Sequence, residues 1–151
     1  MISCLKNTAC HVLLTPHLKE FERLSGVPVA SVLQDPVTHA KRFAREYGVC
    51  VLLKGSTTVV TDGDVTYLVD RGCAGMATAG SGDVLSGVLT GLFGYLPVNA
   101  KTVALGAYLA GRAGELAEKE STSISMTASD TVARLPDAVR EILNGNEKKE
   151  A

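Results

Sequence analysis

The stretch Gly75-Met76-Ala77-Thr78-Ala79-Gly80-Ser81-Gly82-Asp83-Val84-Leu85-Ser86-Gly87 indicates best how this chain folds and where its chemistry lies. Its first half consists of glycine and other small or apolar residues, and a helical pattern of apolar residues begins at Ser81. Asp83 is the one charged side chain between residues 72 and 100. A glycine-rich turn that leads into a helix lets an anionic group come close to the first N–H groups of that helix. The stretch therefore predicts an anion-binding turn at a helix start.

Short apolar runs alternate with longer amphipathic runs along the chain. The runs rich in β-branched residues are predicted to be strands, and they are 11–15, 49–53, 57–61 and 65–69. The last two are expected to form a hairpin through Asp62-Gly63-Asp64. The runs with helical periodicity are predicted to be helices, and they are 19–25, 36–47, 82–96, 100–119 and 129–143. Strands interleaved with helices indicate an α/β layered domain, with a small sheet flanked by helices.

Single residues predict several helix ends and packing contacts. Gly48 is expected to end the helix 36–47, and Asn99 is expected to cap the helix that begins near residue 100. Ser129 or Asp130 can cap the last helix. The glycines spaced along the helix 82–96 are expected to allow close packing against a neighbouring element, and they are Gly87, Gly91 and Gly94.

Composition and charge limit the class of protein. With 151 residues, of which 46% are hydrophobic and 21% are charged, the chain suits a globular domain rather than a disordered segment. The net charge is −1 and 5% of the residues are aromatic, so the sequence indicates neither a basic surface nor a stacking platform for bases. We therefore expect no nucleic-acid partner.

The ends of the chain and its cysteines carry further expectations. We expect residues 1–143 to form the domain and 144–151 a polar tail, with the first residues, to about position 10, loosely held. No apolar run has the length of a membrane span, and the cysteines form no C-x-x-C pair. These features indicate a reducing, cytoplasmic setting, with no membrane partner and no metal site.

Asp83 lies in the first turn of the helix predicted to follow the glycine-rich stretch. The free N–H groups and the dipole of a helix start stabilise negative charge, so this carboxylate is expected to be ionised and able to accept a proton from a hydroxyl. Gly80, Ser81 and Gly82 could neutralise a transferring phosphoryl group while Asp83 activates its acceptor. The alternative is that the loop is an ordinary helix cap.

Two other segments are weaker candidates when each is taken alone. Lys54-Gly55-Ser56-Thr57-Thr58 follows a predicted strand and could place an amine and backbone amides near a phosphate, although it lacks the order of a P-loop. The alternative is a lysine that opens a tight turn. Thr15-Pro16-His17 follows the first strand, at the edge where α/β proteins bind ligands. The alternative is that His17 only begins a helix.

Taken together and in order, these motifs resemble one known family. They are Thr15-Pro16-His17 with Glu20, Leu53-Lys54-Gly55 with Thr57-Thr58, the stretch from Gly75 to Gly87, Ala113-Gly114, and Ala128-Ser129-Asp130. On these residues the chain is similar to the ADP/ATP-dependent NAD(P)H-hydrate dehydratases, which are ribokinase-like repair enzymes. The resemblance covers residues 12–143 and implies the C-terminal half of a ribokinase-like α/β domain.

The resemblance also implies an activity and a site. The family dehydrates (S)-NADH hydrate or (S)-NADPH hydrate by phosphorylating the substrate hydroxyl and then eliminating phosphate. By similarity, Asp83 is the catalytic and substrate-binding carboxylate, and His17 contacts the substrate. The nucleotide-binding positions are, by similarity, Lys54, Gly55, Ser56, Thr57, Thr58 and Gly82, and the anion hole is formed by Gly80, Ser81 and Gly82. ADP or ATP is the implied co-substrate, and Mg²⁺ is expected to accompany it.

Two alternatives of different classes stay open at this point. Another ribokinase-like enzyme, a small-molecule kinase, would use the same turn and Asp83. A truncated, non-catalytic nucleotide-binding or assembly fragment would bind nucleotide without turnover. Because the N-terminal half of the family's domain has no counterpart here, we expect either a homo-oligomer or a chain that supplies the missing half.

Overall fold

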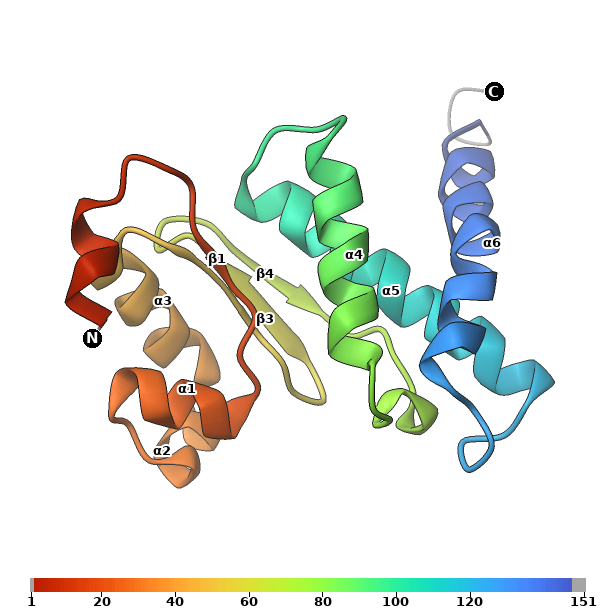
Figure 1. Ribbon diagram of the computed structural model, residues 1–151, viewed down its shortest axis with the longest axis horizontal. Helices are drawn as coiled ribbons and strands as arrows, with labels where there is room; N and C mark the ends of the chain where they lie inside the picture. Colours follow the sequence, from red (N-terminus) through yellow and green to blue (C-terminus); the bar gives the residue numbers. More distant parts are fainter. Residues whose placement is uncertain (1, 148–151) are drawn as a thin grey trace. The chain divides into compact units, whose positions relative to one another are not determined.

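The computed structural model describes residues 2–147, which fall into two compact units. The first unit contains the described residues up to Asp70 together with Pro97–Ala104. The second contains Arg71–Leu96 together with the described residues from Leu105 onward. Figure 1 shows the order of the elements along the chain, and each unit is described below by itself.

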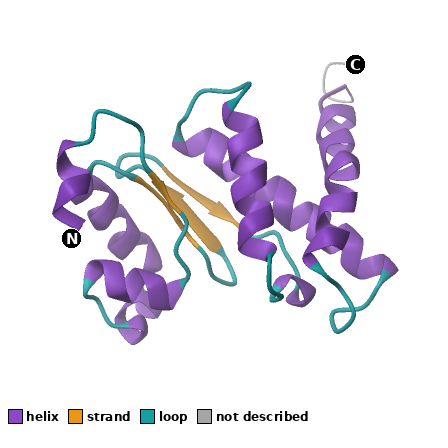
Figure 2. Cartoon of the chain, in the orientation of Figure 1, coloured by secondary structure: helices purple, strands orange, loops and turns teal. Residues whose placement is uncertain are grey.

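The sheet lies in the first unit and has the strand order β1-β2-β3-β4. The strands are β1 (Leu13–Leu14), β2 (Cys50–Leu53), β3 (Thr58–Thr61) and β4 (Thr66–Val69). β1 pairs in parallel with β2, whereas β2–β3 and β3–β4 are antiparallel (Figure 2). The small mixed sheet and the hairpin through Asp62-Gly63-Asp64 are therefore confirmed. The first strand is shorter than the predicted 11–15.

Helices cover one face of this sheet, and their ends follow local sequence signals. They are η1 (Ile2–Asn7), α1 (Leu18–Ser25), α2 (Val29–Gln34) and α3 (Pro36–Tyr47). α3 has the predicted bounds, and Gly48 ends it in the left-handed conformation with φ of 64°. η1 and α2 were not predicted, because each is only six residues long and too short for a clear periodicity. The expectation that the first residues are loosely held is wrong for Leu5, which packs against the core.

The core of the first unit lies between this face of the sheet and the helices (Figure 1). Phe21 of α1 and Phe43 of α3 are buried, with their ring centroids 5.4 Å apart. Val51 of β2 and Val59 of β3 belong to the same cluster. Burial of these apolar side chains is what holds α1 and α3 against the sheet.

The second unit is helical. Its elements are η2 (Ala74–Met76), α4 (Ser81–Phe93) and α6 (Ala128–Glu147), together with α5 (Ala100–Glu120), which begins in the first unit. A cluster centred on Leu109, Ala113 and Ala138 joins side chains of α4, α5 and α6. The three helices predicted from the periodicity after residue 81 are thus confirmed, with boundaries shifted by up to four residues.

The glycine that brings α4 and α5 close together lies on α5. A Cβ atom at Gly106 would come within 2.6 Å of the Leu89 side chain. The expectation that Gly87 and Gly91 serve this purpose is wrong, because both are exposed and a Cβ there would meet nothing within 4 Å. Sequence spacing alone does not show which face of a helix carries the contact.

The predicted cap of α5 is confirmed, and the predicted cap of α6 is corrected. Asn99 accepts a hydrogen bond from Thr102 N–H at 2.9 Å and so caps α5. α6 begins at Ala128, one residue earlier than predicted, so Thr127 takes the cap position. Asp130 accepts hydrogen bonds from the N–H and the hydroxyl of Thr127, each at 2.8 Å. Of the predicted polar tail, residues 144–147 continue α6, and 148–151 lie outside the described residues.

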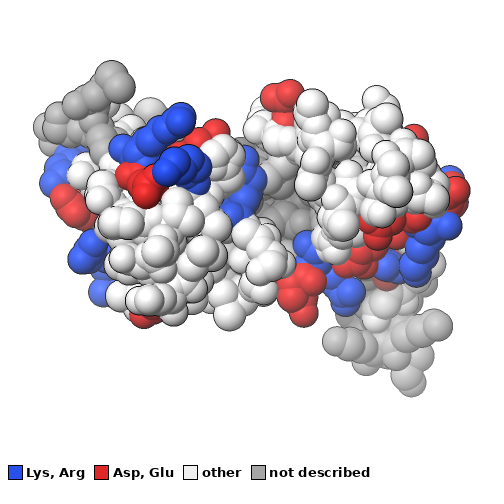
Figure 3. All heavy atoms as spheres, turned by 90° about the horizontal axis from the view of Figure 1, so that it is seen from below, with Lys and Arg blue, Asp and Glu red and all other residues white. Residues whose placement is uncertain are grey.

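Several charged side chains on the surface are paired with opposite charges. In the second unit, Arg112 contacts Glu115 at 2.9 Å and Glu141 at 2.6 Å. The face shown in Figure 3 accordingly carries basic and acidic side chains next to one another, with wide uncharged areas between them. Within the described part of the chain, no helix is both long enough and apolar enough to cross a membrane. Cys10, Cys50 and Cys73 carry free thiols.

Candidate functional site

The first group of predicted site residues follows the carboxyl ends of the parallel strands β1 and β2. The Lys54 N–H donates to the Pro16 carbonyl at 2.9 Å, and His17 pairs with Lys54 in an isolated parallel bridge. His17 and Lys54 therefore lie side by side, although they are far apart in sequence. In α/β proteins, this edge of a parallel pair is where ligands bind.

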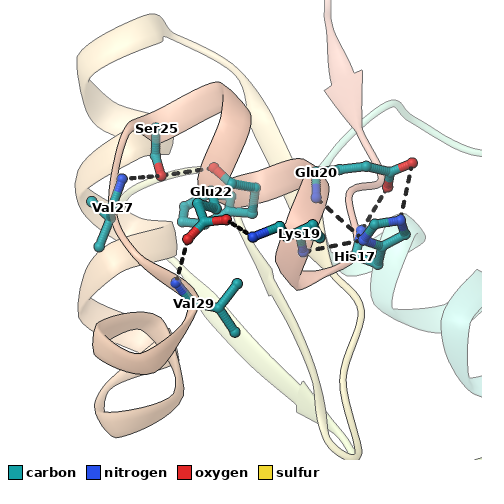
Figure 4. A network of polar contacts seen from close by, with 8 residues as sticks. His17, Lys19, Glu20, Glu22, Ser25, Val27 and Val29 are labelled. Carbon is teal, nitrogen blue, oxygen red and sulfur yellow. Dashed lines mark hydrogen bonds and ion pairs between the residues drawn. The ribbon is translucent and has the colours of Figure 1, made fainter.

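His17 is the N-cap residue of α1, in a reciprocal arrangement with Glu20 (Figure 4). Its Nδ1 atom accepts hydrogen bonds from Lys19 N–H at 3.1 Å and from Glu20 N–H at 3.2 Å. A Glu20 carboxylate oxygen accepts the His17 N–H at 2.8 Å. Because Nδ1 is an acceptor, the neutral ring carries its proton on Nε2, which lies 3.4 Å from the other Glu20 oxygen. His17 thus begins α1, and its side chain is about half exposed.

Glu20 connects His17 with Lys54. The Lys54 ammonium lies 3.9 Å from a Glu20 carboxylate oxygen. The hydrogen bond from the His17 N–H, together with the charges of Lys54 and Arg23, holds the pKa of Glu20 below its ordinary value, against the opposing effect of burial. The edge of the sheet thus carries an ionised carboxylate between an imidazole and an ammonium group.

The segment after Lys54 links β2 to β3. Gly55, Ser56 and Thr57 are exposed, and Thr58 begins β3. Lys54 therefore opens a short connection between antiparallel strands, as the alternative of a lysine that opens a turn expects.

The second group is the turn Gly80–Asp83 in the second unit. Gly80 is the N-cap of α4, with φ of 89°, a left-handed conformation that favours glycine. No side chain caps this helix start. Asp83 is exposed and makes no hydrogen bond or ion pair with the described residues, and the buried Ser81 hydroxyl oxygen also lacks a partner there. The Asp83 side chain therefore does not cap α4.

The start of α6 lies beside this turn. A Cβ atom at Gly80 would be 3.2 Å from the Cβ of Ala128. Thr131, one turn further along α6, is 3% exposed, and its hydroxyl has no hydrogen-bond partner among the described residues. Sequence reasoning noted Ala128-Ser129-Asp130 as part of the resemblance but did not indicate that it adjoins Gly80. That neighbourhood arises from helix packing, which leaves no local signal.

A cavity of about 500 Å³ lies elsewhere in the first unit, and none of the predicted site residues lines it. It is bordered by residues that precede β1 and β2 and by the start of α5, among them Cys10, Cys50 and Asn99. It is therefore at the amino ends of the parallel strands, opposite His17 and Lys54. Burial and the charge of Asp62 raise the pKa of Cys50 to about 11, so this thiol is protonated and unreactive.

The chain was compared with known proteins and structures. The sequence profile of the NAD(P)H-hydrate dehydratase family matches residues 2–137. The chain is 42% identical over 133 residues to a bifunctional NAD(P)H-hydrate repair enzyme from Moorella thermoacetica, covering 87% of this chain and 25% of that protein. It is 38% identical over 128 residues to an ADP-dependent (S)-NAD(P)H-hydrate dehydratase from Cenarchaeum symbiosum, covering 85% of this chain and 44% of that protein.

Solved structures show the same fold. The ADP/ATP-dependent NAD(P)H-hydrate dehydratase from Bacillus subtilis, co-crystallised with ATP and Mg²⁺, is 30% identical with a TM-score of 0.81, covering 90% of this chain and 51% of that one. A ribokinase-like superfamily protein also matches, which confirms the predicted ribokinase-like architecture. The chain spans about a quarter to a half of the length of these relatives.

Proposed function

The chain belongs to the NAD(P)H-hydrate dehydratase family, and on that basis we propose that it contributes to the ADP- or ATP-dependent dehydration of (S)-NAD(P)H hydrate to NAD(P)H. The observation that carries this proposal is the turn Gly80–Asp83. Its helix start is uncapped by any side chain, and Asp83 has no partner among the described residues. A carboxylate that makes no hydrogen bond or ion pair with the described residues is available to a ligand.

The proposed reaction has two steps. First, the Asp83 carboxylate accepts the proton of the substrate hydroxyl while that oxygen attacks the terminal phosphorus of the nucleotide. The new O–P bond forms as the bond to the leaving nucleotide breaks, and the N–H groups at the start of α4 stabilise the charge on the phosphoryl oxygens. Second, the C–O bond breaks, phosphate leaves with the electron pair, and loss of a proton from the adjacent carbon restores the double bond.

The remaining predicted residues bind the two substrates in this proposal. Lys54, the segment Gly55–Thr58 and Gly82 bind the nucleotide, and His17 contacts the NAD(P)H hydrate. The amine of Lys54 suits phosphate oxygens, and the residues after it, Gly55, Ser56 and Thr57, are exposed. The described residues contain no group of three metal-ligating side chains. We therefore expect Mg²⁺ to be held mainly by phosphate oxygens and water.

The open edge of the sheet supports the further proposal that additional strands complete the domain. The Val12 carbonyl accepts from Cys50 N–H at 2.9 Å, and the Pro16 carbonyl accepts from Lys54 N–H. Backbone groups alternate along a strand, so those of Leu13 point away from β2, where no described strand lies. Relatives are at least about twice as long as the matched region. We propose that strands from the remainder of the protein, a partner chain or a second copy pair with β1.

The cellular setting is part of the same proposal. Free thiols at Cys10, Cys50 and Cys73 suit a reducing compartment, and the proposed substrates are nicotinamide nucleotides. We therefore propose that the protein acts in the cytoplasm.

An assay of recovered NAD(P)H absorbance with ADP or ATP tests the function. The chain is measured alone and after co-expression with the part of the Bacillus subtilis relative that it does not cover. We expect the chain alone to bind ADP weakly and to self-associate in light scattering. We expect the complex of the chain with the co-expressed part, called the completed form below, to restore NAD(P)H.

Other results would contradict this proposal in distinguishable ways. A phosphorylated product without recovered NAD(P)H would identify a small-molecule kinase. Nucleotide binding without turnover in the completed form would identify a non-catalytic fragment. A monodisperse monomer that dehydrates NAD(P)H hydrate unaided would show that no additional strands are needed.

A further inference from the structure

The segment before the anion-binding turn is held by two carboxylates of α5. The Gly72 N–H donates to Glu115 Oε1 at 3.1 Å, and the Gly75 N–H donates to Glu118 Oε1 at 2.9 Å. Donors and acceptors are each three residues apart, and residues three apart on a helix lie on the same face. The glycine-rich segment therefore runs along one face of α5, and Glu115 and Glu118 anchor it by its backbone.

Glycines on the same face of α5 allow this close approach. A Cβ atom at Gly111 would lie 2.6 Å from the Arg71 carbonyl oxygen, and a Cβ atom at Gly114 would collide with the Met76 sulfur. A side chain at Gly111 would push the backbone of the segment away from the helix, and one at Gly114 would displace the Met76 side chain. The two glycines and the two carboxylates thus form one surface, which we call the α5 track (Gly111, Gly114, Glu115 and Glu118).

Of the two carboxylates in the α5 track, Glu118 holds the residue that is nearer in sequence to the turn. Its partner Gly75 is buried, and four residues separate Gly75 from Gly80. Glu115, in contrast, also pairs with Arg71 at 3.6 Å and with Arg112 at 2.9 Å. Ion pairs with Arg71 and Arg112 thus support the position of Glu115. Glu118 has no such ion pair among the described residues, and its carboxylate accepts the Gly75 N–H.

We propose that Glu118 is a positioning residue for the anion-binding turn, acting through its hydrogen bond to the Gly75 N–H. This inference rests on the proposed function, because it assumes that the turn binds a nucleotide phosphate. A mobile turn would hold its N–H groups in the binding geometry for only part of the time. The apparent affinity for the nucleotide would fall in proportion to that fraction.

The test compares Glu118→Ala with Glu118→Gln in the full chain. Alanine removes the acceptor, whereas the amide oxygen of glutamine can still accept the Gly75 N–H. Glu120→Ala is the control, because it makes the same chemical change at an exposed position of α5 whose carboxylate pairs with Arg134 of α6 and not with the segment. Binding of ADP is measured by calorimetry, and amide hydrogen exchange is measured for residues 75–83.

We expect Glu118→Ala to weaken ADP binding about tenfold and to speed exchange at Gly75 and through the turn, in line with a reduced fraction of the binding-competent form. Glu118→Gln should restore both toward wild type. The thermal midpoint of Glu118→Ala should stay close to that of Glu120→Ala, which a general loss of helix stability would not allow.

Several results would overturn the inference. It fails if Glu118→Ala binds ADP and exchanges like wild type, or if Glu118→Gln is as defective as Glu118→Ala. If the wild-type chain shows no response to ADP, the proposed function fails, and the exchange at Gly75 then decides by itself whether Glu118 holds the segment. Faster exchange throughout α5 would show a merely structural role.

Discussion

The two groups of predicted site residues differ in how their polar atoms are satisfied. At the edge of the sheet, His17 caps α1, Glu20 completes the cap, and Lys54 pairs with Glu20. At the start of α4, Asp83 and the Ser81 hydroxyl have no partner among the described residues. The side-chain contacts of the first group therefore stabilise the folded chain. Asp83 and the Ser81 hydroxyl make no such contacts with the described residues.

This difference determines how each group responds to substitution. A change at His17 or Glu20 alters helix stability as well as any contact with a substrate, so the two effects must be separated. A change at Asp83 removes no described interaction. An unpartnered buried hydroxyl such as that of Ser81 costs about 1–3 kcal/mol, which a bound ligand could recover by hydrogen bonding to it. Substitutions at the turn Gly80–Asp83 are therefore expected to lower activity, and substitutions at the edge of the sheet, at His17 or Glu20, are expected to lower stability.

The largest expected effect is that of Asp83→Asn on turnover. In any completed form that dehydrates NAD(P)H hydrate, loss of the positioned base should lower the rate about 10²–10⁴-fold. Because the side chain is exposed, the stability should change by no more than about 1 kcal/mol, the size of a charge effect at a helix start. Steady-state kinetics and urea unfolding measure the two quantities. Undiminished turnover of Asp83→Asn would sink the assignment.

The next effect is loss of nucleotide binding in Gly82→Val. Gly82 is exposed and does not have a positive φ, so valine fits the helix backbone but blocks the approach of a phosphate to it. Calorimetry with ADP should show no binding by a folded sample. Gly87→Val is the control, because a Cβ at Gly87 meets nothing within 4 Å. Equal affinity in both variants would mean that phosphate does not bind at this turn.

His17 should show the stability effect that the turn lacks. His17→Ala removes the N-cap of α1 and should cost about 0.5–2 kcal/mol in urea unfolding. His17→Asn keeps a good cap and should retain most of the stability. If His17 also contacts the substrate, both variants should raise KM in the completed form. A fully stable His17→Ala would show that the cap contributes little.

The smallest effect concerns acid stability through Glu20. Its pKa is lowered in the folded state, so its contribution is present above the ordinary value of 4.5 and is lost as the pH falls through the lower, folded value. Wild type should exceed Glu20→Gln by no more than about 1 kcal/mol at neutral pH, since the group is well exposed. The difference should disappear on acidification. Urea unfolding between neutral pH and about pH 3 measures it, and a difference that grows toward low pH would contradict the sign.

Much of the fold could be predicted because its signals are local. Pro36 and Gly48 delimit α3, and Asp62-Gly63-Asp64 joins two strands, because proline, glycine and aspartate restrict the backbone wherever they occur. η1 and α2 escaped prediction because their short runs form only against the core of the first unit. The first strand was predicted too long, since only Leu13–Leu14 pair with β2.

The candidate site was predicted to a similar extent. The glycine-rich stretch indicated a helix start suited to anions, and the structure shows that start uncapped by side chains. The sequence did not reveal that His17 forms a reciprocal cap with Glu20. Nor did it single out Glu115 and Glu118, because their partners are backbone N–H groups forty-three residues away in the chain.

The sequence by itself determined the family, the small α/β sheet and the turn at Gly80–Asp83, because these depend on residue types that act over a few positions. Only the tertiary structure decided which glycines allow close packing and which polar atoms have partners. Gly111 and Gly114 weaken a helix when judged by propensity, yet in the fold they give the segment Arg71–Met76 its place on α5. The physical reason is that close packing and hydrogen-bond satisfaction depend on residues distant in the chain, whose approach no local pattern encodes.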